Sequence, residues 1–286
     1  MSETKPVRGK RSLAPLAAGL FKWAVLGFFL AVALFPLLWL VLNSLKTNLE
    51  LQASPFALPA RPAFENYANA IAMAELPRLF LNSVVVAAGT VFLNLLVSSM
   101  AGFVLSRESW RGRDGVRTVL EAGVLVPIIA FMVPYFTLVT KLGLYDKLGT
   151  LVLVYAAINI PVSIFLVTSF MRSIPKELEE AAIIDGCGFF QRYSRMILPL
   201  SRSGLVTAGT FCFIFAWNEF VMAMLLTSSI SSRTIQLGIR FFTSQFVTDY
   251  AGMFAAIVLS MLPSVVGYVF LHNKIIAGLT AGAVKG

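Results

Sequence analysis

The chain has 286 residues, of which 58% are hydrophobic and only 13% charged, and its formal net charge is +9. That apolar content exceeds what the core of a soluble domain of this length buries, so the composition excludes an ordinary soluble protein and indicates a membrane protein. The positive charge does not indicate nucleic-acid binding, because the Lys and Arg residues lie between apolar runs and form no basic surface.

Six apolar segments are long enough to cross a bilayer as helices, since a hydrocarbon core about 30 Å thick requires about 20 helical residues. They run from Trp23 to Leu42, Leu79 to Leu105, Val119 to Val139, Leu151 to Phe170, Leu205 to Thr227 and Met253 to Leu271. The first follows Lys5, Arg8, Lys10 and Arg11 as a secretory signal would, but its length and the lack of a small-residue cleavage site predict an uncleaved helix. The sequence therefore predicts an all-α integral membrane protein of about six transmembrane helices.

The distribution of basic residues predicts the orientation of these spans. Of the 23 Lys and Arg residues, 16 lie in the termini, after the second span or after the fourth span. Because cytoplasmic loops of membrane proteins are enriched in Lys and Arg, both termini should be cytoplasmic. The expected division is an N-terminal tail over 1–22, a first helix over 23–42, an extracytoplasmic loop over 43–78, a five-helix core over 79–271 and a cytoplasmic tail over 272–286.

Few residues offer covalent or metal chemistry. Cys187 and Cys212 are too few for a disulfide framework and should both be reduced. His272 is the only histidine, so no His/Cys metal site is expected and an interfacial position is favoured. The chain has neither an HExxH pair nor a GxxxxGK[ST] phosphate loop. A membrane-embedded enzyme is therefore disfavoured, and no cofactor is expected on this chain.

The long loop over 173–199, between the fourth and fifth spans, carries the strongest signal. Ser173 is suited to an N-cap, Pro175 to a first turn and Gly186 to a C-cap with positive φ, which predicts a helix of about three turns outside the membrane. Three glutamates, Glu177, Glu179 and Glu180, complement the positive helix terminus. Leu178, Ala181, Ala182 and Asp185 share one face, and a small-residue face flanked by carboxylates suits a groove on a partner. A surface helix on lipid headgroups is the plainer alternative, which repulsion from an anionic leaflet disfavours.

The same loop carries a family resemblance. Glu180-Ala181-Ala182, then Gly186 after three residues, then Leu198-Pro199 resembles the EAA loop of permease subunits in bacterial ABC importers, although Met196 stands where isoleucine is usual. Further similarities to the carbohydrate-uptake branch, including maltose-type subunits, lie in Pro62 to Tyr67, Trp217 to Phe220 and the ending Gly278 to Gly286. The resemblance implies a type I importer permease fold with a cytoplasmic coupling helix.

This resemblance also implies a substrate and partners. The substrate would be a sugar or short oligosaccharide, and the protein would be located in the cytoplasmic (inner) membrane. The partners would be two cytoplasmic ATPase subunits that bind ATP and Mg, a second permease of a different sequence, and an extracytoplasmic sugar-binding protein. The residues expected to dock the ATPase are Glu177, Leu178, Glu180, Ala181, Ala182, Asp185 and Gly186. The tail from Gly278 to Gly286 is either a frayed terminus or a segment inserted between the ATPase subunits.

Polar residues inside the spans are candidates for the translocation pathway or for helix contacts. They are Asn94, Asn159, Trp217, Asn218 and Glu219. A charge at mid-membrane depth costs about 2.5 to 3.5 kcal/mol, so Glu219 should face protein or water. It would contact either sugar hydroxyls or a neighbouring helix, and the second role is favoured slightly. An ion-coupled carrier could use such residues as a relay, but it does not account for the EAA-type loop.

Overall fold

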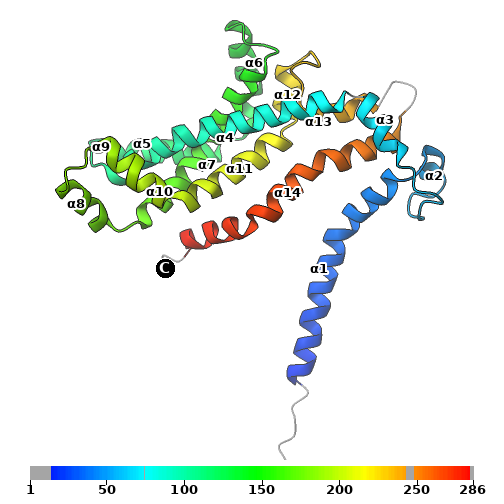
Figure 1. The fold of residues 1–286 in the computed structure, drawn as a ribbon, viewed down its shortest axis with the longest axis horizontal. Coiled ribbons are helices and arrows are strands. Elements are labelled where there is room, and N and C mark those ends of the chain that lie inside the picture. The colour runs from blue at the N-terminus through cyan, green and yellow to red at the C-terminus, as the bar shows by residue number, and fades with distance from the viewer. Residues whose placement is uncertain (1–13, 74, 243–247, 284–286) are drawn as a thin grey trace, which may run out of the picture.

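The computed structural model describes residues 14–73, 75–242 and 248–283, and this part of the chain is mostly helical (Figure 1). Four of its helices are long and apolar enough to cross a membrane, or up to six segments if each of two bent pairs counts as one span. The four are α1 (Ala14–Ser44), α4 (Leu76–Arg107), α7 (Leu148–Ser173) and α14 (Tyr250–Ala283). The expected number of about six spans is thus reached when each bent pair counts as one span.

The expected third span is bent sharply. It is built from α5 (Arg113–Ala122), 3-10 turns over Gly123–Leu125 and Ile128–Phe131, and α6 (Met132–Lys141), with an angle of 99° at the break. Pro127 lies at the break, and proline lacks the N–H of a helical hydrogen bond and disfavours helix in the preceding residue. The prediction of one continuous helix from Val119 to Val139 is therefore wrong.

The expected fifth span is also interrupted. The chain forms α9 (Phe189–Gln191), a π-helical turn (Arg192–Ile197) and α10 (Leu198–Leu200), and then bends by 74° into α11 (Arg202–Asn218). Helix α11 ends at Asn218, Glu219 has an extended backbone, and a short α12 (Val221–Leu226) follows. A single helix from Leu205 to Thr227 is therefore also wrong.

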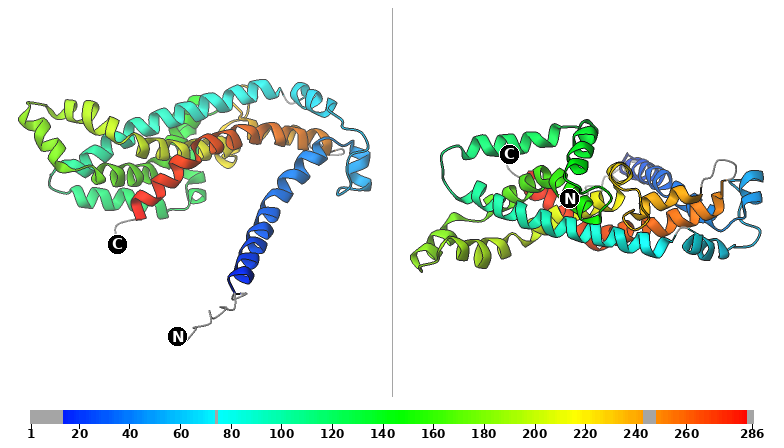
Figure 2. Two further views of the ribbon diagram at one scale, coloured as in Figure 1. Left: turned by 60° about the horizontal axis from the view of Figure 1, so that its bottom comes forward. Right: turned by 90° about the horizontal axis from the view of Figure 1, so that it is seen from above.

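Helices α4, α7 and α11 pack against one another, and α14 packs against α11 (Figure 1). The short α8 (Lys176–Ile184) lies at one end of this bundle, here called the α8 end. The opposite end, here called the α12 end, contains α12, α13 (Ile235–Gly238) and the turn Ile239–Phe242. It also contains two helices of the expected loop over 43–78, α2 (Asn48–Ala53) and α3 (Glu65–Met73). The C-terminal end of α1 contacts α14, and the rest of α1 projects away from the bundle (Figure 2).

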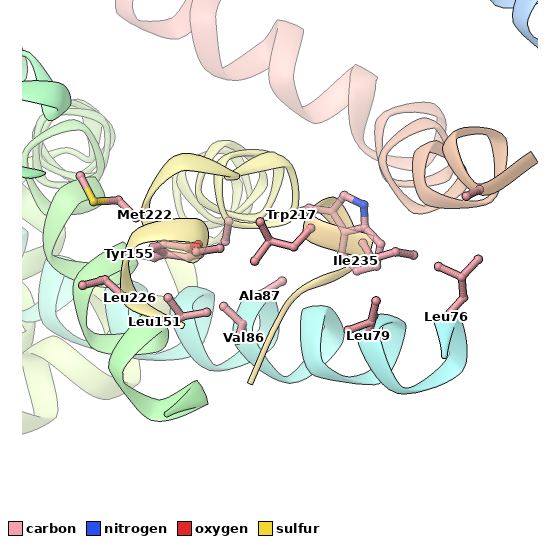
Figure 3. Close-up of a cluster of buried hydrophobic side chains, with 14 of the residues drawn as sticks. Leu76, Leu79, Val86, Ala87, Leu151, Tyr155, Trp217, Met222, Leu226 and Ile235 are labelled. Atoms are coloured by element: carbon pink, nitrogen blue, oxygen red, sulfur yellow. The ribbon is translucent and has the colours of Figure 1, made fainter. Parts of the chain in front are cut away.

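Two apolar cores hold the bundle together. The larger one joins α4, α7, α11 and α12 around Tyr155 and Trp217, which are 0% and 1% exposed (Figure 3). The smaller one, toward the α8 end, contains Phe103, Tyr193 and Ile197, and the hydroxyls of Ser99 and Tyr193 share a 2.8 Å hydrogen bond within it. Because both cores include residues of α4, this helix connects the two ends of the molecule.

Helix α14 continues to Ala283, through most of the segment assigned by sequence to a tail over 272–286. The basic N-terminal residues Lys5, Arg8, Lys10 and Arg11 and the last residues, 284–286, lie outside the described part. The side chain of His272 is also outside it.

Candidate functional site

Helix α8 has the predicted C-terminal cap but a different N-terminal one. Gly186 has φ +83°, its amide donates to the carbonyl of Ile183 (3.0 Å), and the amide of Cys187 donates to that of Ala182 (2.9 Å). This left-handed cap confirms the expected conformation of Gly186. The expected N-cap is wrong, because Ser173 is the last residue of α7 and Pro175 precedes the first residue of α8.

One side of α8 is uncovered by the rest of the described chain. Of the residues expected to dock a partner, Glu177, Leu178, Glu180, Ala181, Asp185 and Gly186 are exposed and Ala182 is half-buried. Leu178, Ile183 and Ile184 are 48%, 53% and 85% exposed. Ile183 and Ile184 were not among the candidates, although an apolar pair on a short helix outside the spans is a detectable signal. The exposed surface of α8 thus combines carboxylates with apolar side chains.

The opposite side of α8 is fixed by ion pairs, centred on Glu179. The carboxylate of Glu179 accepts a 2.6 Å hydrogen bond from Arg192 and lies 3.8 Å from the guanidinium of Arg107. Arg192 also donates to Glu108 (2.9 Å). We call Arg107, Glu108, Glu179 and Arg192 the α8 ion cluster. It connects α8 to the end of α4 and to the π-helical turn.

Arg107 also caps the last turn of α7. Its guanidinium donates to the carbonyls of Met171 and Ile174, the second at 2.8 Å, and only 2% of its side chain is exposed. These carbonyls are among the groups that a helix C-terminus leaves without intrahelical partners. Arg107 therefore joins the ends of α4 and α7 to the start of α8. Sequence reasoning had assigned Arg107 only to the positive loop charge, and no local motif reveals these partners.

The interruption between α11 and α12 is stabilised by the carboxylate of Glu219. Its two oxygens accept hydrogen bonds from the amides of Met222 (2.8 Å) and Ala223 (3.0 Å), which belong to the first turn of α12. The phenol of Tyr155, on α7, donates to the same carboxylate at 2.6 Å. Glu219 therefore caps one helix and contacts another in the described chain.

Trp217 and Asn218 point into different surroundings. The indole of Trp217 is buried, stacks on Phe213 at 5.9 Å and donates to the carbonyl of Ser260 on α14 (2.9 Å). Asn218 is exposed, and its amide donates to the carbonyl of Ile214 (2.8 Å) and the hydroxyl of Ser264 (3.3 Å). Of the two, only Asn218 offers a polar group at the surface of this chain.

Asn94 and Asn159 lie at the contact between α4 and α7. The amide of Asn94 donates to the carbonyl of Ala156 (3.1 Å), and that of Asn159 donates to the carbonyl of Tyr155 (2.9 Å). Asn94 is 0% exposed, and its side-chain oxygen has no hydrogen-bond partner within the described part of the chain. In this arrangement both side chains bond α7 backbone.

Nothing among the described residues gathers three His, Cys, Asp or Glu side chains as a metal ion would require.

At the α12 end, the carboxylate of Asp146 accepts hydrogen bonds from the amides of Ser228 (2.8 Å) and Ser229 (3.0 Å) and from the hydroxyl of Ser232. Partial burial raises the pKa of Asp146, but these hydrogen bonds outweigh it and hold the pKa well below the ordinary value of 3.8. This residue ties the loop before α7 to the loop after α12.

The bundle of membrane-length helices with a short exposed helix at one end defines a multi-pass membrane protein. The model of the family "Binding-protein-dependent transport system inner membrane component" matches residues 94–276, so the chain belongs to this family.

Relatives and a solved structure extend the similarity to nearly the whole chain. The chain is 39% identical to a putative ABC transporter permease protein of Caldicellulosiruptor sp., with 93% of this chain and 97% of the relative covered. It is 33% identical to a diacetylchitobiose uptake permease of Streptomyces coelicolor (92% and 87% covered) and 32% identical to a trehalose transport permease of Mycobacterium tuberculosis (92% and 97%). A chain from the crystal structure of a bacterial ABC transporter that imports alginate superposes with a TM-score of 0.81 at 21% identity, covering 94% of this chain and 99% of that one.

These findings confirm the predicted fold and family. The chain is the inner-membrane permease subunit of an ABC importer, a transport subunit and not an enzyme.

Proposed function

We propose that this permease forms half of a translocation pathway for a sugar or short oligosaccharide. Support comes from relatives at 32% and 33% identity that are named for trehalose and diacetylchitobiose uptake. An ion-coupled secondary carrier is the alternative, and membership of a binding-protein-dependent family disfavours it.

The observation that carries the mechanism is the exposed side of α8. Glu177, Glu180 and Asp185 provide carboxylates at its rim, while Leu178 and Ala181 provide a shallow apolar surface between them. Such a helix fits a groove edged by basic residues on a partner. The partner in this proposal is the ATPase subunit, which binds ATP and Mg. Half-buried Ala182 and exposed Gly186 leave room for close approach.

The α8 end then faces the cytoplasm. The excess of Lys and Arg in the loops at this end and in both termini supports that orientation. The α12 end faces the extracytoplasmic sugar-binding protein, and the permease pairs with a second permease across the pathway. Closure of two ATPase subunits moves both coupling helices and opens the pathway alternately to each side.

The polar residues inside the bundle divide between two roles. Asn94, Trp217 and Glu219 hold helices together in this proposal, because each donates to or accepts from a neighbouring helix, whereas Asn159 donates within its own helix α7. Asn218 is the candidate for substrate contact, because it is exposed. Its amide can bond a sugar hydroxyl without leaving a buried group unpaired.

The docking role of α8 is tested by Gly186→Trp in the complex assembled with its ATPase. A Cβ at φ +83° is strained, and the indole would hold α8 away from a groove. Gly143→Trp is the matched control, because Gly143 also has a positive φ (+66°) and open surroundings but lies at the α12 end.

We expect both variants to insert into the membrane and only Gly186→Trp to lose co-purifying ATPase and ATP-dependent sugar uptake in proteoliposomes. Equal ATPase retention by the two variants would contradict docking through α8. Uptake by vesicles that contain this chain alone would instead support a carrier.

A further inference from the structure

A second polar site lies at the first residue of α8, next to the α8 ion cluster, because Arg113 beside it also donates to the carbonyl of Glu108 (3.3 Å). A cavity of about 510 Å³ is lined by Ser106, Arg113, Asp114, Arg117, Arg172 and Lys176. These residues come from the end of α4, from α5, from the last turn of α7 and from the first residue of α8. Four cationic side chains from three helices thus converge on one opening.

The cations in this cavity are only partly neutralised. Arg113 pairs with Asp114 (3.3 Å) and Arg117 pairs with Glu121 (3.2 Å). No carboxylate of the described chain lies within ion-pair distance of Arg172 or Lys176. Four cationic side chains therefore surround one cavity beside only two ion-paired carboxylates, and like charges repel at short range. An anion bound there would relieve this repulsion.

The position of the cavity indicates which anion. Ser106 and Arg172 are the second-last residues of two membrane-length helices, so the cavity lies at the depth of lipid headgroups. Phe165 stands two turns before Arg172 on the same face of α7 and is 50% exposed. On α5, Val116 follows Arg113 by three residues and is 45% exposed. Apolar surface therefore continues from the cationic opening toward the membrane interior, as acyl chains would require.

We propose that Arg113, Arg117, Arg172 and Lys176 bind the phosphate group of an anionic phospholipid in the inner leaflet. Basic pockets between helices on the cytoplasmic side are suited to such headgroups. The leaflet assignment rests on the proposed orientation of the α8 end. A lipid held there contacts α5, α7 and the start of α8 together, so it reinforces the base of the coupling helix.

The test uses the full-length chain in nanodiscs of phosphatidylcholine with phosphatidylglycerol, followed by transfer into lipid-free detergent and native mass spectrometry. We expect wild type to retain phosphatidylglycerol in preference to phosphatidylcholine. Arg117→Gln combined with Arg172→Gln should weaken this retention by about fivefold for each Arg removed. The pair Arg117→Lys and Arg172→Lys keeps both charges and should retain the lipid, which controls for folding. Arg195→Gln removes an exposed Arg outside the cavity and should also retain it.

Three results would overturn the proposal. The first is unchanged phosphatidylglycerol retention in the double Gln variant. The second is stabilisation of wild type by inorganic phosphate without lipid retention, which would assign the site to a soluble anion. The third is unchanged lipid retention with loss of co-purifying ATPase, which would assign the cations to the protein partner. Because lipid retention is measured without transport, failure of the proposed sugar uptake would not affect it.

Discussion

Glu179→Gln should loosen the base of the coupling helix without altering its exposed side. The substitution keeps the shape of the side chain but removes the charge that Arg192 contacts at 2.6 Å and Arg107 approaches at 3.8 Å. Breaking a buried ion pair costs about 3 to 5 kcal/mol when the remaining charge has no partner. Here Arg192 keeps Glu108 at 2.9 Å and glutamine still accepts a hydrogen bond, so we expect a loss of about 1.5 to 3 kcal/mol.

The measurement is the free energy of unfolding in mixed micelles, together with the amount of sugar moved per ATP hydrolysed in the assembled complex. Glu75→Gln is the control, because Glu75 forms an ion pair with Arg78 (3.9 Å) in which both side chains are more than half exposed. Such a pair contributes about 0 to 1 kcal/mol. Equal destabilisation by Glu179→Gln and Glu75→Gln would refute the reasoning.

Three further variants probe other parts of the structure. Glu219→Gln should weaken the hydrogen bonds that cap Met222 and Ala223 and lower the unfolding free energy by about 1 to 3 kcal/mol. If the complex assembles normally and only the apparent substrate affinity falls, Glu219 belongs to the translocation pathway instead. Asp146→Asn should speed hydrogen exchange of the Ser228 and Ser229 amides. Folding lowers the pKa of Asp146, so its contribution to stability should be constant at neutral pH and disappear only as the pH falls below about 3.8. A loss of stability between pH 8 and 6 would contradict the assignment of this contribution to Asp146. Gly204→Ala would place a Cβ 2.4 Å from the ring of Phe170, so overpacking should cost about 1 to 3 kcal/mol and lower the melting temperature. Gly115→Ala is the control and should leave the melting temperature unchanged, because its Cβ would lie in open space.

Hydropathy and loop chemistry predicted most of the architecture, because both depend on local sequence. Apolar runs of bilayer length located the spans, and the left-handed cap at Gly186 followed from its place after the helix. The break at Asn218 was missed because the cap that stabilises it includes Tyr155, 64 residues away. The bend at Pro127 was missed because the proline lies inside an uninterrupted apolar run.

The candidate site was predictable to a similar extent. The residues on the exposed side of α8 were identified from their pattern, and their role remains a prediction. Glu179 was grouped with Glu177 and Glu180 as a helix-terminus charge, whereas the structure places it against Arg192 and Arg107. Those arginines lie on other helices, so only the tertiary fold shows that one glutamate of the three is structural.

The placement of α1 bears on how this sequence can change over time. Residues 20–38 are exposed along the helix, so packing within the chain imposes few requirements on individual side chains there. An apolar residue of almost any shape satisfies a lipid-facing position, whereas Gly204 and Trp217 must fit fixed neighbours. Substitutions among apolar residues should therefore accumulate faster in α1 than in the bundle.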